Sequence, residues 1–370
     1  MESIYYIGLD VHKKTIAYCI KTVTGGIVCQ GMVKAERRAL QKWLVDLPGS
    51  WVGAMEATMF TGWIYDFLKP YAVELKVAHP AMLKAITAAK KKNDRADAEK
   101  LADLLRVNLL PECTMMSEEL RELRRVLRYR NMVVRTASRM KNKISGLLME
   151  VGAVYDKRKL HGKKYFGQLL ERVEDVPESV KDLLKLSRSS MELFEAVQKK
   201  LLKTLREDSL ISKRVELLRS ISGVGEVTAL TWVLEIGDPK RFSNSRQAIS
   251  YCGLCSAQHE SAGKEHRGPI SKKRNKYLQS MLIEAANLAP YWNPQLGILY
   301  EKELTRGNRN RATLAVARKL VIYMLAVDRR GKPFMTENVV ISSESGLNGS
   351  RQLSPFRPHL QYLKEQKVFR

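Results

Sequence analysis

The chain has 370 residues, 45% of them hydrophobic, which is enough to bury one or more sizeable cores. Its 64 Lys and Arg against 39 Asp and Glu give a net charge of +25, which favours a nucleic-acid partner over a merely basic protein. The sequence has no apolar run of about 18 residues, the length of a membrane helix. With no signal-peptide pattern at the N-terminus and five sparse Cys, we expect a cytoplasmic protein without membrane segments.

The first part of the chain, residues 1–110, alternates strand and helix signals. Strand patterns occur at 4–10, 15–21, 26–33, 51–57 and 73–78, and helical patterns at 36–47, 61–68, 81–89 and 96–107. A turn signal at 22–26 joins the second and third strands as a hairpin. Three antiparallel strands followed by alternating helix and strand predict an α/β domain, a mixed sheet flanked by helices.

The rest of the chain reads as helical. Residues 111–212 are expected to hold long helices, at 117–151 and 178–207, with a basic linker at 155–164 between them. Residues 213–334 form a third, mainly helical unit. Residues 335–370 are rich in Ser, Gly and Asn without periodicity, and we expect a flexible tail there.

The long helix at 117–151 carries unbalanced charge. Between Arg121 and Lys143 lie nine basic residues and one acid, Glu122. This imbalance favours contact with a phosphate backbone over an ordinary solvated face. The candidate contacts are Arg121, Arg124, Arg125, Arg128, Arg135 and Arg139.

The helix at 178–207 has apolar residues near heptad positions. They are Val180, Leu184, Met191, Phe194, Leu201 and Leu205, with the polar Ser187 and Gln198 interrupting the seam. Such spacing is typical of a coiled coil or an antiparallel helix pair. An oligomer contact and packing within one chain explain it equally well.

Four acids stand where strands end or helices begin. Asp10 and Glu56 end predicted strands, and Asp94 and Asp97 share one face of a helix start. Each alone has an ordinary explanation, Asp94 as a helix N-cap and Glu56 as a loop acid. Together at one sheet edge they would repel one another unless cations bind. Two Mg²⁺ ions about 3.5–4 Å apart would do so and would support phosphoryl transfer.

Three segments around these acids carry a family resemblance. Residues 8–13 (Gly-Leu-Asp-Val-His-Lys), 55–58 and 92–98 resemble the DEDD signature of transposases of insertion-sequence family 110, which is related to the Piv/MooV DNA invertases. Further motifs follow in the family's order at 223–225, 236–242, 251–254, 261–264 and 270–273. The resemblance covers about residues 4–331 and is specific as a set.

The resemblance implies a RuvC-like, RNase H-type first domain with Asp10, Glu56, Asp94 and Asp97 as metal ligands. It also implies a nucleophilic Ser261 that forms a phosphoserine link to DNA. A Ser hydroxyl needs a base or a metal to activate it, so the two domains, from one protomer or from two, must meet over the DNA.

The predicted activity is therefore that of a DNA transposase. The resemblance further implies a structured non-coding bridge RNA that pairs with donor and target DNA, and assembly as a dimer of dimers. Two alternatives remain: a RuvC-like nuclease that hydrolyses DNA junctions, in which Ser261 is structural, and a non-catalytic nucleic-acid-binding protein.

The segment around Ser261, expected as a loop, departs from the family pattern. Ala262 stands between Ser261 and Gly263, and because Ala does not tolerate positive φ as Gly does, it narrows the range of backbone conformations open to this segment. Ser256 stands where family members commonly have Pro. A basic cluster surrounds the serine. Its members are Lys264, His266, Arg267, Lys272, Lys273, Arg274 and Lys276, which would hold phosphates without reading sequence.

Two weaker patterns accompany the serine motif. Gly223 and Gly225 resemble a helix-hairpin-helix turn, whose amides can hold a phosphate, although a plain tight turn explains them nearly as well. Cys252, Cys255, His259 and His266 have a spacing loosely suited to zinc. We favour Cys252 as a small buried residue instead.

Overall fold

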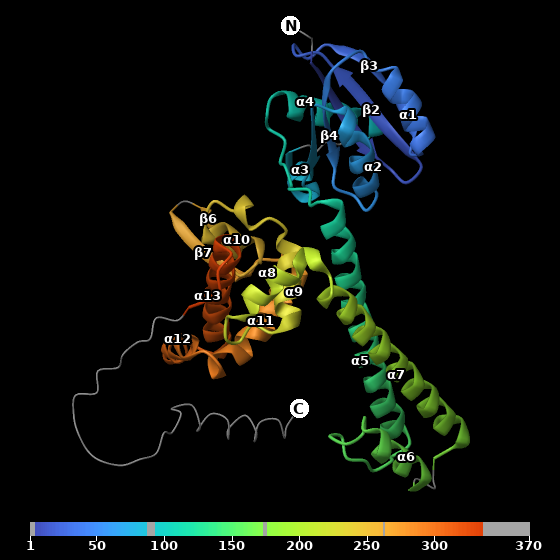
Figure 1. The fold of residues 1–370 in the computed structure, drawn as a ribbon, viewed down its shortest axis with the longest axis vertical. Coiled ribbons are helices and arrows are strands. Elements are labelled where there is room, and N and C mark those ends of the chain that lie inside the picture. The colour runs from blue at the N-terminus through green and yellow to red at the C-terminus, as the bar shows by residue number, and fades with distance from the viewer. Residues whose placement is uncertain (1–3, 87–92, 173–175, 262, 336–370) are drawn as a thin grey trace, which may run out of the picture. The chain divides into compact units, whose positions relative to one another are not determined.

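The computed structural model describes residues 4–86, 93–172, 176–261 and 263–335. The chain divides into two compact units, Met1–Glu119 and Leu120–Arg370, coloured from blue to red along the chain in Figure 1. The predicted flexible tail, apart from its first residue, and the end of the helix predicted at 81–89 lie outside the described residues. Within the described residues, no helix combines the length and apolar character that a membrane span requires.

The first unit is built on a five-stranded mixed sheet in the order β3-β2-β1-β4-β5. Its strands are β1 (Tyr5–Val11), β2 (Thr15–Lys21), β3 (Ile27–Lys34), β4 (Trp51–Glu56) and β5 (Glu74–Ala78). β1 and β2 pair antiparallel, as do β2 and β3, whereas β4 is parallel to both β1 and β5. The predicted mixed sheet is confirmed.

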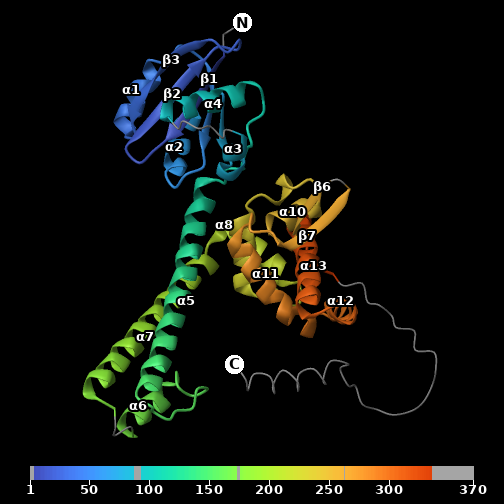
Figure 2. The ribbon, with the colours of Figure 1, turned by 180° about the vertical axis from the view of Figure 1, so that it is seen from behind.

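Helices cover both faces of this sheet (Figures 1 and 2). The helices are α1 (Arg37–Val45), α2 (Thr61–Leu68), α3 (Pro80–Ile86) and α4 (Asp94–Arg106), with a short 3-10 turn at Lys69–Tyr71. Ile7 and Leu9 of β1 pack with Leu40 of α1 and Ile64 of α2. Because strand residues alternate between faces, Gly8 and Asp10 point to the opposite face, where α4 packs.

The second unit begins with an antiparallel helix pair. α5 (Glu118–Glu150) runs out, α6 (Lys163–Arg172) lies at the far end, and α7 (Glu178–Arg206) returns beside α5, as both views show. At the far end Ile144 packs with Leu184 and Met191, and Lys141 pairs with Glu195 at 2.8 Å. Packing within one chain therefore accounts for Leu184 and Met191 of the heptad series.

The remaining elements form a helical core with one hairpin. They are α8 (Ser209–Arg219), α9 (Glu226–Ile236), η2 (Pro239–Arg241), α10 (Ser245–Tyr251), β6 (Ser256–Ser261), β7 (Lys264–Ile270), α11 (Lys276–Leu288), η3 (Ala289–Tyr291), α12 (Pro294–Thr305) and α13 (Arg309–Arg330). α9 is buried from Thr228 to Ile236 and packs with α8 and α11. Leu127 of α5 and Leu205 of α7 belong to the same core, so the helix pair is continuous with these helices.

The segment around Ser261 corrects one expectation. Residues 256–261 and 264–270 pair as antiparallel strands rather than forming a loop. The polar sequence has no alternating apolar pattern, which is the signal that reveals a half-buried strand. Backbone pairing across a short turn forms this hairpin without that signal.

Candidate active site

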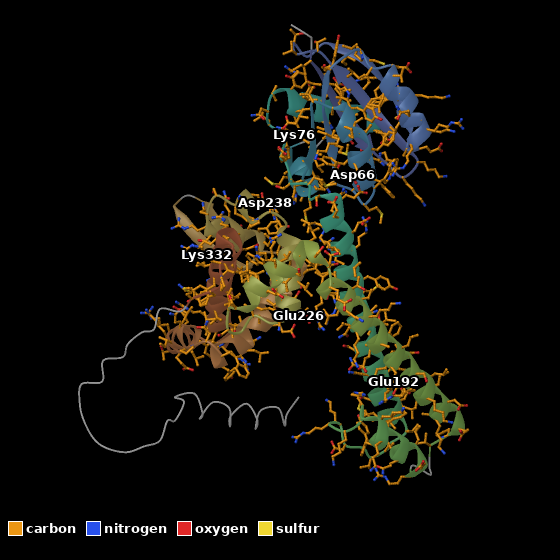
Figure 3. The ribbon with its side chains drawn as sticks, viewed as in Figure 1. Asp66, Lys76, Glu192, Glu226, Asp238 and Lys332 are labelled. Carbon is orange, nitrogen blue, oxygen red and sulfur yellow. The ribbon has the colours of Figure 1, made fainter. Side chains whose placement is uncertain are left out.

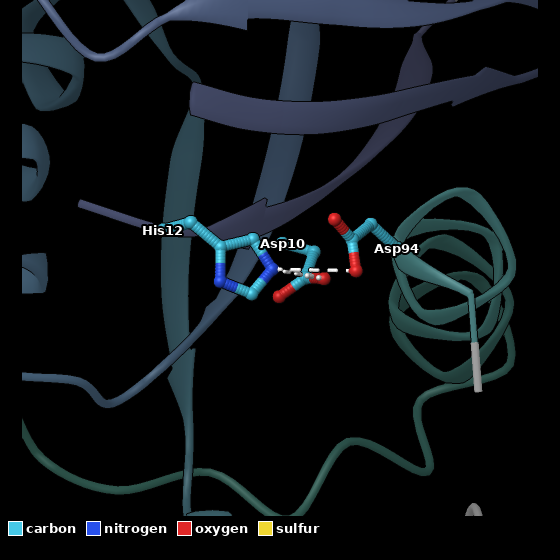
Figure 4. Close-up of side chains that lie close together, drawn as sticks. All are labelled: Asp10, His12 and Asp94. Atoms are coloured by element: carbon cyan, nitrogen blue, oxygen red, sulfur yellow. Dashed lines mark hydrogen bonds and ion pairs between the residues drawn. The ribbon is translucent and has the colours of Figure 1, made fainter. Parts of the chain in front are cut away.

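Three side chains of the first unit converge at the end of β1 (Figure 4). His12 Nε2 lies 3.1 Å from Asp10 Oδ2 and 3.5 Å from Asp94 Oδ1. One ligand atom from each residue lies within 4.8 Å of the other two. The Asp10 side chain is 11% exposed, whereas those of His12 and Asp94 are 45% and 48% exposed. The cluster is thus buried at Asp10 and reachable from solvent at the other two residues.

The electrostatics of Asp10 favour a cation. Burial raises the pKa of this carboxyl, interaction with His12 lowers it, and the charges of Asp94 and Asp97 raise it further. A bound divalent cation would offset both the burial of the charge and the repulsion between carboxylates. Two carboxylates and an imidazole with converging ligand atoms fit such an ion.

The close approach of α4 to the sheet depends on Gly8. A Cβ added at Gly8 would lie 2.5 Å from the backbone N of Ala102 and closer still to the backbone O of Ala98. Ala17 and Cys19 of β2 form a small-residue cluster with Ala98. These small side chains let the helix backbone lie directly on the strands, and this brings the first turn of α4 beside Asp10.

Lys21 of β2 holds the same helix by charge. Its ammonium lies 3.0 Å from Glu99 and 2.6 Å from Asp103, both on α4, and its side chain is buried. Although burial opposes the charge, hydrogen bonds to Asp103 and Glu99 raise the pKa of Lys21. The charged form is therefore part of the folded structure at neutral pH.

Replacing Lys21 by Met should lower the free energy of unfolding of the first unit by about 2 kcal/mol, because charge-assisted hydrogen bonds are lost while the stem is kept. Denaturant unfolding measures the change. Lys76→Met is the control, since the Lys76 ammonium (labelled in Figure 3) lies 3.5 Å from Glu74 and 3.6 Å from Glu112. Such looser pairs should cost less than about 1 kcal/mol. Equal losses in both variants would contradict this role of Lys21.

The other two predicted acids occupy neighbouring positions. Glu56 ends β4 directly after Met55, the register partner of Leu9, so it stands on the strand next to Asp10. Asp97 lies in the first turn of α4, where Lys100 donates to it at 3.2 Å. Among the described residues, the group with ligand atoms within 4.8 Å contains Asp10 and Asp94 but neither Glu56 nor Asp97. Asn93, not Asp94, caps the helix.

His12 is the site residue that sequence reasoning missed. It lies within the motif at 8–13, in which the family resemblance assigns a role to Asp10 alone. The available signal was its spacing: two residues after Asp10, an extended chain returns to the same face. A hydrogen bond from the His12 amide to the Thr15 carbonyl at 2.9 Å holds the connection to β2.

Ser261 is the last residue of β6, at the turn of the β6–β7 hairpin. Its Cα partner across the hairpin is Lys264. Gly263 has φ +73°, a conformation that favours glycine. Ala262 and the side chains of Ser261 and Lys264 lie outside the described part of the structure. The serine and the carboxylates belong to different units of the chain.

The base of this hairpin is anchored by two turns. The Ser271 amide donates to the Cys255 carbonyl at 2.9 Å, and Gln279 donates to the Gly253 carbonyl at 2.6 Å. Gly253 has φ +71°, and a Cβ there would clash with Arg274. The structure thus packs the motif at 251–254 against the basic turn at 271–275, two segments that the sequence kept apart.

A buried carboxylate links this base to the long helix. Glu235 of α9, whose side chain is 0% exposed, receives two hydrogen bonds of 2.8 Å from Arg128 of α5. Asn275, the N-cap of α11, donates to the same carboxylate at 2.8 Å. The Arg128 guanidinium also lies 4.8 Å from the ring centre of Tyr277. Glu235 therefore joins α5, α9 and the start of α11.

The predicted phosphate contacts on α5 fall into two groups. Arg121 is buried, and Arg128 binds the buried Glu235. Arg124 is half-buried, and its burial together with the charge of the neighbouring Arg128 lowers its pKa. Arg125, Arg135 and Arg139 are exposed, as are Lys272, Lys273 and Arg274 in the turn after β7. The first group contacts the protein interior, and the second faces solvent.

Gly223 and Gly225 form the turn between α8 and α9. Gly223 has φ +97°, and a Cβ there would lie 2.7 Å from Ala289, so both conformation and packing require glycine. Gly225 is the N-cap of α9 and faces open space. Glu226, labelled in Figure 3, follows it and is paired with Arg206 at 2.6 Å, which lowers the pKa of Glu226. The turn therefore has an ion-paired carboxylate, that of Glu226, directly after Gly225.

Cys252 lies in the apolar core of the second unit. It is fully buried, and burial raises the pKa of its thiol to about 12. Zinc binds the thiolate form, so this environment favours the interpretation of Cys252 as a small core residue. His259 and His266 are Cα partners across the hairpin, and their side chains lie outside the described part.

Two family models match the chain. Residues 7–152 match the model of DEDD transposases of the IS110 type, and residues 215–301 match the model described as transposase IS116/IS110/IS902 family. Two relatives match most of the chain. The transposase for insertion sequence element IS1111A of Coxiella burnetii is 27% identical over 86% of this chain and 88% of its own length. The transposase for insertion sequence element IS1328 of Yersinia enterocolitica is 24% identical over 90% of this chain and 99% of its own length. The transposase for IS1533 of Leptospira borgpetersenii is 25% identical over 69% of this chain and 76% of its own.

Proposed function

We propose that this chain, which belongs to the IS110 family of transposases, cuts and rejoins insertion-sequence DNA through Ser261 and a carboxylate-bound divalent ion. The observation that carries the proposal is the convergence of Asp10 and Asp94 at the end of β1. It joins two of the motif acids that lie far apart in the sequence.

Asp10 and Asp94 would hold Mg²⁺, with Glu56 and Asp97 completing the ligand set. When bound, the ion supplies positive charge to a DNA phosphate and favours the deprotonated form of an attacking hydroxyl. Asp10 is buried and would fix the position of the ion, while the more exposed Asp94 lies where a DNA phosphate could reach the ion from solvent. The packing of α4 on Gly8 orients these carboxylates.

Ser261 would act as the nucleophile. Its Oγ forms a bond to a DNA phosphorus, the bond from that phosphorus to one strand end breaks, and the strand end leaves as a hydroxyl. A hydroxyl of the partner strand then attacks the phosphoserine and releases Ser261, so one phosphodiester is exchanged for another. Its support is the family motif, together with a place at the tip of a hairpin anchored through Ser271 and Cys255.

Exposed cations would hold the nucleic acid. We assign phosphate contacts to Arg125, Arg135 and Arg139 of α5, to Lys272, Lys273 and Arg274 after β7, and to Lys264 with the amides near Gly223 and Gly225. Buried Arg121, half-buried Arg124 and Glu235-bound Arg128 would contribute charge and structure. A structured RNA of the element would pair with donor and target DNA. The complex would assemble in the cytoplasm on a dimer of dimers. The net charge of +25 supports binding of this much nucleic acid.

The test is trapping of a protein–DNA adduct. Purified protein is incubated with Mg²⁺, element-junction DNA and RNA transcribed from the flanking non-coding segment, and denaturing gels reveal covalent complexes. We expect an adduct that Ser261→Ala and Asp10→Asn abolish and Ser256→Ala, at the other end of β6, retains.

The alternatives give different gels. Metal-dependent cleavage without an adduct would identify a junction nuclease, and binding without cleavage would identify a non-catalytic protein. An adduct that persists in Ser261→Ala would overturn the assignment of the nucleophile. Omitting the RNA tests its role, since strand exchange should then be lost.

A further inference from the structure

We propose that the imidazole of His12 is a direct ligand of the ion held by Asp10 and Asp94, and that this nitrogen makes the site bind Mn²⁺ more tightly than Mg²⁺. The proposal deepens the proposed function and rests on its metal site. It adds a residue outside the four-acid signature and names the class of cation, a first-row transition metal, that the site prefers.

The distances suit a shared ion. Adjacent ligands of an octahedral ion with bonds of about 2.1 Å are about 3 Å apart. His12 Nε2 lies 3.1 Å from Asp10 Oδ2 and 3.5 Å from Asp94 Oδ1. One Nε2 proton can serve only one of these oxygens, and 3.5 Å is long for a hydrogen bond. An ion among the three atoms would satisfy all of them at once.

The backbone presents His12 to the site. It follows β1 by one residue, and its amide donates to Thr15 at the start of β2. The last pair of the ladder, Val11 with Ile16, lies directly beside it. A side chain held by a strand connection loses little freedom on binding an ion, so His12 is placed in advance as a ligand.

The chemistry of nitrogen sets the metal preference. Mg²⁺ strongly prefers oxygen ligands and keeps its waters. First-row transition metals accept a nitrogen ligand more readily, and Mn²⁺, although the weakest binder among them, also keeps a preference for carboxylates. A site of four carboxylates would discriminate little against Mg²⁺. Replacement of one oxygen position by His12 shifts the balance towards Mn²⁺, while the carboxylates still accept Mg²⁺.

Pulsed electron paramagnetic resonance of Mn²⁺ bound to the full chain, without nucleic acid, tests the ligand directly. We expect ¹⁴N modulation from a coordinated imidazole in the wild type and its loss in His12→Gln. His79→Gln is the matched control, because His79 is exposed and follows β5 at the same edge of the sheet; it should keep the modulation. Bound Mn²⁺ without nitrogen coupling, or coupling lost only in His79→Gln, would overturn the proposal.

Titration of each ion measures the preference. His12→Gln should weaken Mn²⁺ binding about tenfold, the low end for disturbing a metal ligand environment, and should change Mg²⁺ binding less. His12→Ala checks that Gln itself does not bind, and circular dichroism checks folding. Unchanged Mn²⁺ affinity would contradict the proposal. Binding that survives Asp10→Asn would instead overturn the metal site of the proposed function, and a failed Ser261 adduct test would leave His12 ligation standing.

Discussion

Gly8→Ala should destabilise the first unit by about 3 kcal/mol and abolish tight metal binding. The new methyl would lie 2.5 Å from the backbone N of Ala102 and nearer still to the backbone O of Ala98. Neither atom is the movable end of a side chain, so α4 itself must shift away from β1. Overpacking of a core costs about 1–3 kcal/mol, and rigid backbone neighbours place this case at the upper end.

The same shift would separate Asp94 from Asp10, because the two carboxylates come from the two elements that move apart. Denaturant unfolding measures the stability, and Mn²⁺ titration measures the site. The control is Gly146→Ala in α5, where a Cβ would meet nothing within 4 Å. That variant should gain about 0.5–1 kcal/mol, the helix preference for Ala over Gly. A Gly8→Ala protein with wild-type stability and metal affinity would refute this account of α4.

Arg128→Ala should lower the free energy of unfolding of the second unit by about 3 kcal/mol. It would leave the Glu235 carboxylate, 0% exposed, with Asn275 as its remaining described side-chain donor. Breaking a buried ion pair from one side costs about 3–5 kcal/mol, since the other charge stays buried. The Arg128 side chain is 41% exposed, so water can enter and the lower end applies. Thermal unfolding should show a fall of roughly 6–12 °C.

Two variants sharpen this measurement. Arg125→Ala on the same helix removes an exposed arginine paired with Glu122 at 3.2 Å, and should change stability by less than about 0.5 kcal/mol. Arg128→Ala combined with Glu235→Gln should cost less than the sum of the single changes, because the uncharged amide tolerates burial better. Equal effects of Arg125→Ala and Arg128→Ala, or strict additivity, would contradict the buried pair.

Much of the first unit could be predicted because its signals are local. Alternating and helical periodicities found all five strands and the helices flanking them, and the order of elements predicted the mixed sheet. Asp10 and Glu56 were expected at strand ends and Asp94 at a helix start, where the structure has them. The β6–β7 hairpin escaped because its polar residues carry no periodicity. The place of His12 in the site could not be predicted, because a single histidine in a sequence does not show which side chains lie near it in the fold.

The sequence by itself determined the strongly basic charge of the chain, the strands and helices of the first unit, the two long helices and the resemblance to IS110 transposases. These follow from composition, from residue spacing within one element and from short motifs, all of which are local. Only the tertiary structure decided which polar side chains meet: His12 with Asp10 and Asp94, Lys21 with α4, and Arg128 with Glu235. Of the basic residues predicted on α5, it turned some inward and left others facing solvent. Burial and long-range contact set the role of a charged side chain, and neither can be read from neighbours along the chain.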